Sequence, residues 1–245
     1  MTDISMALPS DKYASNEYLR DNPTWDLEDS PWKAKKVEEL LAVTGYKPRS
    51  VCEVGCGAGG VLANLRSFFP DAELFGFDIA PNAAQFWSRH TLANIHFEVG
   101  DFLELNERRF DVLLLLDVIE HLENPFDFLS RLRKHADLFI FHVPLDLSAI
   151  NILRESPLLR ARTKVGHIQY FTKYLALALV NDCGYEVLKC HYTGAAFTSP
   201  KRNWKTRLAA LPRRLACSVN KDFGVRVLGG ETLMILAQAR NESGS

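Results

Sequence analysis

The stretch from Glu53 to Gly60, Glu-Val-Gly-Cys-Gly-Ala-Gly-Gly, combines closely spaced glycines with one acidic residue. Gly55, Gly57 and Gly60 fit the G-x-G-x-x-G spacing with which a loop after a strand binds a dinucleotide. Glu53 lies two residues before this loop, where its carboxylate would repel a pyrophosphate in a crevice of low dielectric constant. A ligand with positive charge and no phosphate suits such a loop better. The pattern therefore favours a cationic ligand over a dinucleotide.

Two further acidic residues follow stretches that are expected to form strands. Asp78 ends the second of these stretches, and a carboxylate there can accept hydrogen bonds from both hydroxyls of a ribose. NAD sites use the same contact, so Asp78 does not by itself distinguish between ligands. Asp101 follows Gly100 at the end of the third stretch. Its carboxylate could contact a ligand there, or Gly100 and Asp101 could simply form a polar turn.

A third group of polar residues follows the expected fourth strand. Asp117, Glu120 and His121 are spaced i, i+3 and i+4, so that in a helical turn their side chains share one face. Two carboxylates and an imidazole could hold a divalent metal there. Structural roles and a direct catalytic role are the alternatives, and we expect no metal.

The elements that must position these residues alternate between strand and helix, which is typical of a parallel sheet covered on both faces. The expected strands are 50–54, 73–78, 95–99, 111–116, 138–143, 185–191 and 232–239. The first expected helix begins at Ser30 and Pro31 and ends at Gly45. The other expected helices are 60–69, 80–91, 126–134 and 173–183.

With these elements placed, the chain resembles the class I S-adenosylmethionine-dependent methyltransferases. The resemblance rests on Glu-x-Gly-x-Gly-x-Gly at 53–59, Gly-Phe-Asp-Ile-Ala-Pro at 76–81, Gly-Asp-Phe at 100–102 and Phe110 to Leu122 with Asp-Val-Ile-Glu-His-Leu. It covers 51–143 strongly and 166–239 more weakly. The resemblance implies an α/β fold of the Rossmann-like kind, a doubly wound, mostly parallel seven-stranded sheet with helical insertions, in which only the last strand is antiparallel.

The resemblance also implies S-adenosylmethionine as the methyl donor, bound across the carboxyl ends of the strands. Asp101 and Phe102 would hold the adenine, and the glycines would let the backbone approach the methionine part. The cofactor-binding residues that it implies are Glu53, Gly55, Cys56, Gly57, Gly59, Asp78, Ile79, Asp101, Phe102, Asp117 and Val118. Some relatives bind a divalent metal through an acid-x-x-Glu-His group at the position of Asp117 to His121.

Three histidines are candidates for the base that an acceptor needs if it must lose a proton. His167 lies in Gly-His-Ile-Gln-Tyr-Phe-Thr, which is similar to a G-H-x-x-x-[FY]-[ST] stretch of many small-molecule methyltransferases. His142 stands at the end of the fifth strand, where a half-buried structural histidine is the alternative. We expect His167 to serve as the base, slightly ahead of His142, with His121 as the third candidate.

The domain organisation follows from these assignments. We expect one methyltransferase domain over 1–245, with an N-terminal arm and helix in 1–45 and a cofactor-binding core in 50–143. Two insertions on the substrate side are expected at 147–166 and 200–226. Residues 202–219 of the second insertion should be helical, with a kink or a new start at Pro212.

The charge of the whole chain, −1, gives no argument for nucleic acid or membrane binding, but its distribution is uneven. Residues 200–226 carry eight basic residues and one acid, Asp222. This segment could be a solvated helical face, a contact for an anionic ligand such as a nucleotide sugar or glycan, or a surface for a membrane or RNA. No nucleic-acid-binding module is visible, and the oligomeric state is open.

The five cysteines form no metal pattern, and we expect reduced thiols in a cytoplasmic protein. No signal peptide is expected, and the apolar run 113–116 is too short to span a bilayer.

These observations predict methyl transfer to a small-molecule or saccharide-derived acceptor, at oxygen. The alternatives are methylation of RNA or protein, a nucleotide-linked oxidoreductase that uses the glycine loop, and a cofactor-binding scaffold without turnover.

Overall fold

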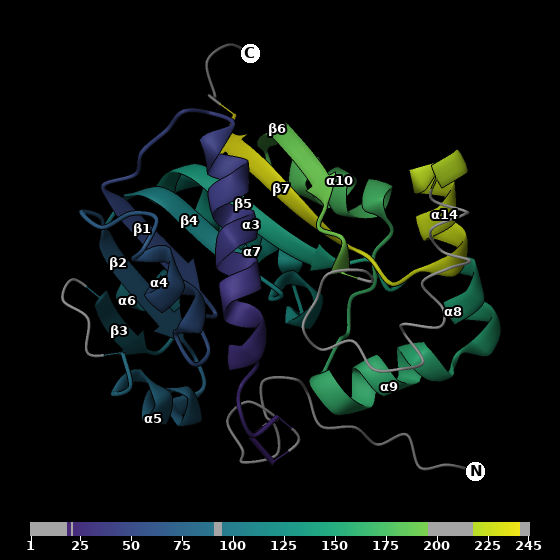
Figure 1. Cartoon of the computed structure of the whole chain (residues 1–245), viewed down its shortest axis with the longest axis horizontal. Coiled ribbons are helices and arrows are strands. Elements are labelled where there is room, and N and C mark those ends of the chain that lie inside the picture. The colour runs from purple at the N-terminus through teal and green to yellow at the C-terminus, as the bar shows by residue number, and fades with distance from the viewer. Residues whose placement is uncertain (1–18, 21, 91–94, 196–217, 241–245) are drawn as a thin grey trace.

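A computed structural model of the chain describes residues 19–20, 22–90, 95–195 and 218–240. Within these residues a seven-stranded sheet has the strand order β3-β2-β1-β4-β5-β7-β6 (Figure 1). The strands are β1 (Ser50–Val54), β2 (Glu73–Asp78), β3 (Ile95–Val99), β4 (Phe110–Leu116), β5 (Ala136–Pro144), β6 (Tyr185–Tyr192) and β7 (Thr232–Ala239). The first five strands pair in parallel, and β7 runs antiparallel to both β5 and β6. The predicted fold class is confirmed.

The strand β4 forms the centre of the sheet because its sequence is apolar on both faces. Residues 112–116 are all buried, as expected for a parallel strand covered on two sides. It pairs with β1 on one edge and β5 on the other. The carboxyl ends of β1, β2, β4 and β5 consequently meet at one edge of the sheet, where the predicted polar residues stand.

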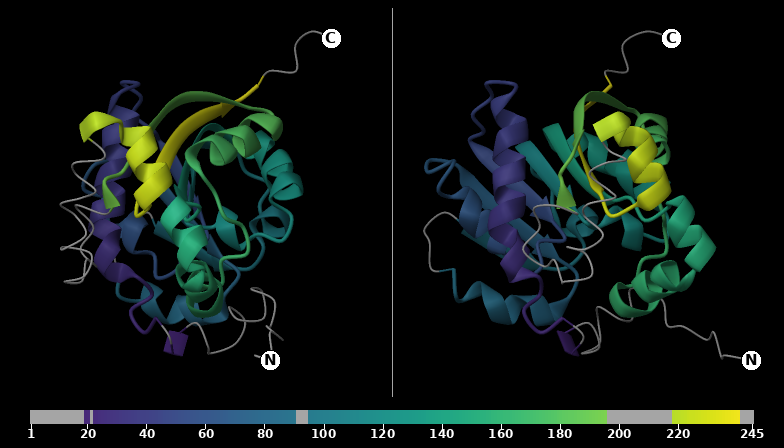
Figure 2. Two further views of the ribbon diagram at one scale, coloured as in Figure 1. Left: turned by 90° about the vertical axis from the view of Figure 1, so that its right-hand side faces the viewer. Right: turned by 45° about the vertical axis from the view of Figure 1, so that its right-hand side comes forward.

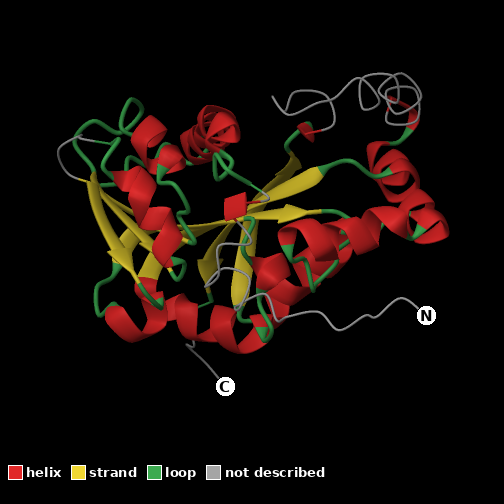
Figure 3. Cartoon of the chain, turned by 90° about the horizontal axis from the view of Figure 1, so that it is seen from below, coloured by secondary structure: helices red, strands yellow, loops and turns green. Residues whose placement is uncertain are grey.

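Helices cover both faces of this sheet (Figure 3). Apolar residues of α3 (Ser30–Ala42) and α4 (Gly60–Leu65) pack in one buried cluster, and those of α7 (Pro125–Leu132) and α10 (Lys173–Asp182) pack in the other. The remaining α-helices are α5 (Ala84–Trp87), α6 (Phe102–Leu105), α8 (Ala149–Arg154), α9 (Ser156–Val165) and α14 (Lys221–Leu228). Short 3-10 helices are η1 (Leu27–Asp29), η2 (Pro81–Ala83), η3 (Ile119–His121) and η4 (Arg133–His135).

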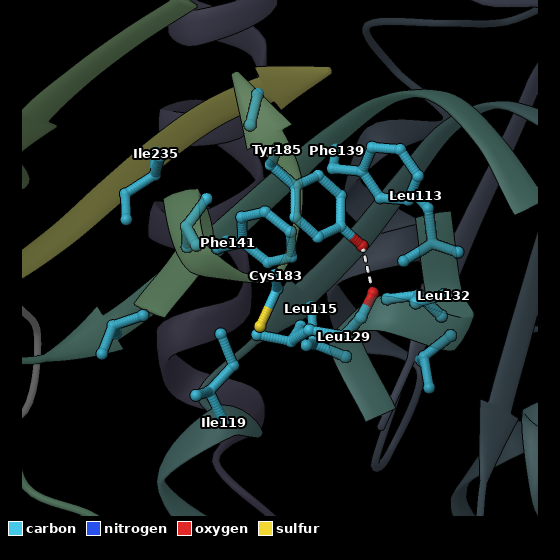
Figure 4. Packing of buried hydrophobic residues seen from close by; sticks show 14 of the residues in the cluster. Leu113, Leu115, Ile119, Leu129, Leu132, Phe139, Phe141, Cys183, Tyr185 and Ile235 are labelled. Atoms are coloured by element: carbon cyan, nitrogen blue, oxygen red, sulfur yellow. Dashed lines mark hydrogen bonds between the residues drawn. The ribbon is translucent and has the colours of Figure 1, made fainter. Parts of the chain in front are cut away.

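The core under α7 and α10 is dominated by aromatic packing around Tyr185 (Figure 4). The rings of Phe139 and Phe141 contact its ring edge-on, with centroids 4.9 Å and 5.2 Å away. The buried Tyr185 hydroxyl donates a hydrogen bond to the Leu129 carbonyl at 2.8 Å. This bond satisfies the one polar group of the ring and ties the start of β6 to α7.

The seven predicted strands are confirmed, with boundaries that differ by at most two residues at either end. The first insertion, 147–166, contains the two helices α8 and α9; α8 packs beside α14, and α9 packs against α8 (Figure 2). Two predicted helices are shorter than expected. The helix predicted over 60–69 ends at Leu65, and the described part of the one predicted over 80–91 contains only η2 and α5. Most of the helix predicted over 202–219 and most of the arm predicted over 1–30 lie outside the described residues.

Two smaller predictions concern cysteines and membranes. Cys52, Cys56, Cys183 and Cys190 are free thiols, and Cys217 lies outside the described residues. In the part of the chain that the structure describes, no helix combines the length and the apolar character needed to cross a membrane.

Candidate functional site

A cavity of about 620 Å³ lies at the carboxyl ends of the parallel strands. Its lining comes from the glycine loop, the strand ends at Asp78, Asp117 and His142, the segment 25–33 and the turn at His167. A second cavity of about 660 Å³ lies along the outer strands β2 and β3 and contains none of the predicted site residues. The first cavity is therefore the candidate site, and its size is in the range of small-molecule sites.

The glycine loop takes a backbone path that ordinary residues avoid. Gly55, Gly57 and Gly59 have φ values of +75°, +51° and +75°. A Cβ atom on Gly57 would lie 2.7 Å from the ring of Trp25, which packs directly on the loop. The Trp87 indole donates to the Gly57 carbonyl at 2.8 Å, so the loop is held from both sides.

Glu53 brings a buried carboxyl group to this cavity with only 3% of its surface exposed. Its Oε2 atom has no hydrogen-bond partner among the described residues. Burial raises the pKa of Glu53 to about 8, which nearby Lys33 opposes and the carboxylates of Asp78 and Asp117 reinforce. The nearby Lys33 charge does not offset this burial, and Glu53 Oε2 keeps an unused acceptor position.

Asp78 closes β2 and holds the glycine loop from below. Its Oδ2 atom accepts from the Gly57 amide at 2.7 Å and its Oδ1 atom from the Ala80 amide at 2.8 Å. Each carboxylate oxygen can accept a second bond, so hydroxyls of a ligand in the cavity can still bind. The neighbouring Ile79 also lines the cavity and is 57% exposed.

Asp117 stands at the end of β4 with a left-handed backbone, φ +56°, which is strained for a residue other than glycine. Lys33 Nζ lies 2.7 Å from Asp117 Oδ2, and His142 Nδ1 lies 2.7 Å from Asp117 Oδ1. Burial would raise the pKa of Asp117, but His142 and Lys33 together hold it well below its usual value. His142 Nε2 lies 2.8 Å from the Thr232 hydroxyl, so the ring of this buried histidine stands between Asp117 and Thr232.

A second polar cluster lies on the cavity wall formed by η3 and the turn after α9. His167 and His121 stack edge-on with ring centroids 5.0 Å apart, and the Nε2 atom of each lies 3.9 Å from Glu120 Oε1. Burial and the carboxylates of Asp117 and Asp146 raise the pKa of Glu120 well above its usual value. The structure thus joins His167 to His121 and Glu120, while His142 belongs to the separate cluster with Asp117.

Three of the predicted cofactor residues, Gly59, Asp101 and Phe102, lie outside the cavity lining. Asp101 caps α6, with its Oδ1 atom accepting from the Leu103 amide at 2.8 Å, and Phe102 is buried edge-on against Phe77. Neither lines the cavity, and neither does Gly59, whose Cβ position would meet the ring of Phe97. Of the other predicted residues, Glu53, Gly55, Cys56, Gly57, Asp78, Ile79, Asp117 and Val118 all do.

Comparison with known proteins identifies the family. The model of a methyltransferase domain matches residues 30–189, which is more than half of the chain. The chain belongs to this methyltransferase family. It is a class I S-adenosylmethionine-dependent methyltransferase, and S-adenosylmethionine is its methyl donor.

Individual relatives of this methyltransferase are distant. The chain is 29% identical over 114 residues to ajmaline N-methyltransferase of Rauvolfia serpentina, covering 42% of this chain and 39% of the relative. It is 30% identical over 104 residues to trans-aconitate 2-methyltransferase of Deinococcus radiodurans, covering 42% and 40%. The matched region thus spans about two fifths of these relatives' length.

A solved structure confirms the fold over nearly the whole methyltransferase. Magnesium protoporphyrin IX methyltransferase from Synechocystis PCC 6803, with bound SAH, superposes with a TM-score of 0.62 at 17% identity. The superposition covers 95% of this chain and 98% of that one. At this identity the similarity shows the fold alone.

Several residues of the methyltransferase site were not expected from the sequence. Trp25, Ser30, Trp32 and Lys33 reach the cavity from a segment that was expected to be an arm followed by a covering helix. Asp146 was missed as well, and its Oδ2 atom lies 2.7 Å from His167 Nδ1. The one available signal was that Asp146 closely follows His142 and Pro144 after a predicted strand end.

Proposed function

We propose that this methyltransferase methylates an oxygen atom of a small-molecule or saccharide-derived acceptor. The observation that carries the proposal is the cluster of Glu120, His121 and His167 on the cavity wall, with Asp146 beside His167. A hydroxyl acceptor must lose a proton during methylation, whereas a neutral amine can attack without prior deprotonation. A buried carboxyl and two imidazoles beside the cavity suit the first kind of acceptor.

For the donor side, we propose that the residues that line the cavity hold the cofactor. Glu53 would balance the ammonium, Asp78 would accept from the ribose, and Gly55 and Gly57 would let the backbone approach. When bound, S-adenosylmethionine supplies an activated methyl group on a positively charged sulfur. Asp101 and Phe102 would act indirectly, by capping α6 and packing beneath the end of β2.

On the acceptor side, the protein orients the acceptor oxygen, excludes water and takes up the proton at the Glu120–His121–His167 cluster. His142 is proposed to position Asp117 rather than to act as the base, because its buried ring lies between Asp117 and the Thr232 hydroxyl. The division into a cofactor core, 50–143, and acceptor-side segments, 147–166 and 200–226, is part of this proposal. Most of 200–226, the segment predicted to contact anionic ligands or membranes, lies outside the residues that the structure describes.

The test is incubation of the pure protein with methyl-labelled S-adenosylmethionine and extracts of the native cells, followed by identification of the labelled product. We expect a small molecule that carries the label on oxygen. Label in RNA or protein would overturn the proposed acceptor class, and label on nitrogen would overturn the proposed atom. His167→Ala should lower turnover at least 100-fold, the usual size of proton-transfer catalysis, while cofactor affinity stays unchanged.

A further inference from the structure

We propose that Glu120, His121 and His167 bind one divalent transition-metal ion. One ligand atom from each residue lies within 4.8 Å of the other two, with two imidazole nitrogens and one carboxylate oxygen in the set. Metal ligands of this kind lie 2.0–2.2 Å from a zinc ion and therefore roughly 3.4 Å from one another in a tetrahedral site. The two separations of 3.9 Å from Glu120 Oε1 to the Nε2 atoms need to close by only about 0.5 Å.

The hydrogen bonds behind each histidine fix the ring in the form that a metal requires. His121 Nδ1 lies 3.1 Å from the Gly166 carbonyl, and His167 Nδ1 lies 2.7 Å from Asp146 Oδ2. Both partners can only accept, so each Nδ1 carries a proton, and in the neutral form of each ring the lone pair is on Nε2. Metal-bound histidines regularly donate their other nitrogen to a carbonyl or carboxylate in this manner.

Glu120 supplies an independent observation. Its side chain is 0% exposed, and neither carboxylate oxygen has a hydrogen-bond partner among the described residues. Burying a carboxyl group without partners is costly, and a cation between Glu120 and the two histidines would remove that cost. The unpartnered Glu120 carboxyl group and the positions of the two imidazoles are therefore both consistent with a bound cation between them.

The backbone holds the ligands together across a separation of 46 residues. The Glu120 carbonyl accepts from the Ile168 amide at 2.8 Å and from the Gln169 amide at 3.0 Å. These two bonds place His167 against η3 whether or not a ligand is present. The site is therefore preorganised, as a metal site with useful affinity needs to be.

The ligand set differs from the one that the motif Asp117-x-x-Glu120-His121 suggests. Both Asp117 oxygens are engaged by Lys33 and His142, whereas His167 takes the third position. Two imidazoles and one carboxylate suit Zn²⁺, Mn²⁺, Fe²⁺ or Co²⁺ better than Mg²⁺ or Ca²⁺. Three protein ligands also leave positions open for an oxygen of the acceptor, and the metal would lower the pKa of that hydroxyl. With both Nε2 lone pairs on the metal, the proton would leave to solvent instead of to His121 or His167; this step rests on the proposed function.

The test measures metal binding alone, with no acceptor present. Tag-free protein, stripped with chelator, is titrated with Co²⁺ while its visible absorption is followed, and Zn²⁺ is then added as competitor. We expect one Co²⁺ per chain and its displacement by one Zn²⁺. Absence of stoichiometric binding at millimolar Co²⁺ would overturn the metal site and leave the proposed methyl transfer to be judged by its own assay.

Variants assign the ligands. Glu120→Gln, His121→Ala and His167→Ala should each weaken Co²⁺ binding at least tenfold, and Asp146→Asn should weaken it by 10- to 100-fold through loss of the bond that fixes His167. His96→Ala, on the exposed outer strand, is the matched control and should bind Co²⁺ as the unaltered protein does. Unchanged binding in His167→Ala, with circular dichroism like that of the unaltered protein, would refute this ligand set.

Discussion

Burial of single ionisable groups controls the chemistry of the cavity. Glu53 shows this most directly, because burial raises its pKa to about 8 from an ordinary value of 4.5. The folded protein therefore holds the proton of Glu53 more tightly than the unfolded chain does. This preference contributes stability below about pH 4.5, and the contribution is lost as the pH rises through about 8.

Cofactor binding should favour the ionised form of Glu53 over the protonated form. A cationic ligand beside Glu53 favours its ionised form, so we expect close to one proton to be released per cofactor bound at pH 7. At pH 9.5 Glu53 is already ionised and the amine of the free cofactor is largely neutral, so we expect proton uptake instead. Calorimetric titrations in buffers of different ionisation enthalpy measure this number. Glu53→Gln should abolish the release and weaken binding at least tenfold, about 1.4 kcal/mol. Equal proton release in the variant would assign the proton to another group.

Two aspartates at neighbouring strand ends should behave differently. Asp78→Ala should weaken cofactor affinity at least tenfold, because its carboxylate lines the cavity and holds the Gly57 amide. Asp101→Ala removes only a helix cap and should cost about 1 kcal/mol of unfolding free energy with little change in affinity. Isothermal titration with the cofactor and urea unfolding separate these effects. A large loss of affinity in Asp101→Ala would restore the adenine contact that the family resemblance implied.

Among the structural elements, the glycine loop and the segment before α3 act as a pair. Trp25 packs on Gly57, and a Cβ atom on Gly60 would lie 2.4 Å from the Ser30 hydroxyl. The glycines are therefore needed for two reasons, the left-handed turn and the close approach of this segment. The loop and the segment together form one wall of the cavity.

Substitution of two glycines with similar φ angles can distinguish the effect of backbone strain from the effect of contact with Trp25. Gly57→Ala should lower cofactor affinity at least tenfold and destabilise the fold, because the new methyl group meets Trp25. Gly45→Ala, with φ +67° and nothing within 4 Å of its Cβ position, carries only the backbone strain, about 1 kcal/mol, and should bind the cofactor normally. Thermal unfolding and cofactor titration of both variants provide the comparison. Equal losses of affinity would show that contact with Trp25 is unimportant.

The strands could be predicted because local sequence decides them: runs such as Leu113–Leu116 are apolar on both faces and end at polar residues. The roles of Asp101 and His142 could not, because capping of α6 and pairing with Asp117 and Thr232 depend on contacts between distant segments. Lys33 is the clearest case. On a helix it looks like any exposed lysine, yet its ammonium lies 2.7 Å from Asp117 beside Glu53.

On the scale of the whole molecule, the cavity joins segments from almost the full length of the described chain, from Trp25 to Thr232. A ligand there contacts both the sheet and its insertions, so binding should stabilise the entire fold. At one hundred times its Kd, S-adenosylhomocysteine should add about 2.7 kcal/mol and raise the Tm by roughly 5–10 °C. Thermal scans with S-adenosylhomocysteine and with NAD measure this directly. A Tm that rises with NAD and not with S-adenosylhomocysteine would contradict the donor site described above.

The two hydrogen bonds on the Glu120 carbonyl have a consequence for how this protein can change. They are made by main-chain amides of Ile168 and Gln169, so their formation does not depend on the side chains at those positions. The helices α8 and α9 form an excursion that leaves the sheet after β5 and returns to this anchor. The His167 amide also donates to the Ala161 carbonyl of α9 at 3.3 Å, so the main chain at the end of α9 contributes to this anchor while most side chains of α8 and α9 do not. If 149–165 contacts the acceptor as proposed, exchange of its side chains should change acceptor preference while the main-chain bonds to Glu120 and Ala161 keep His167 in place.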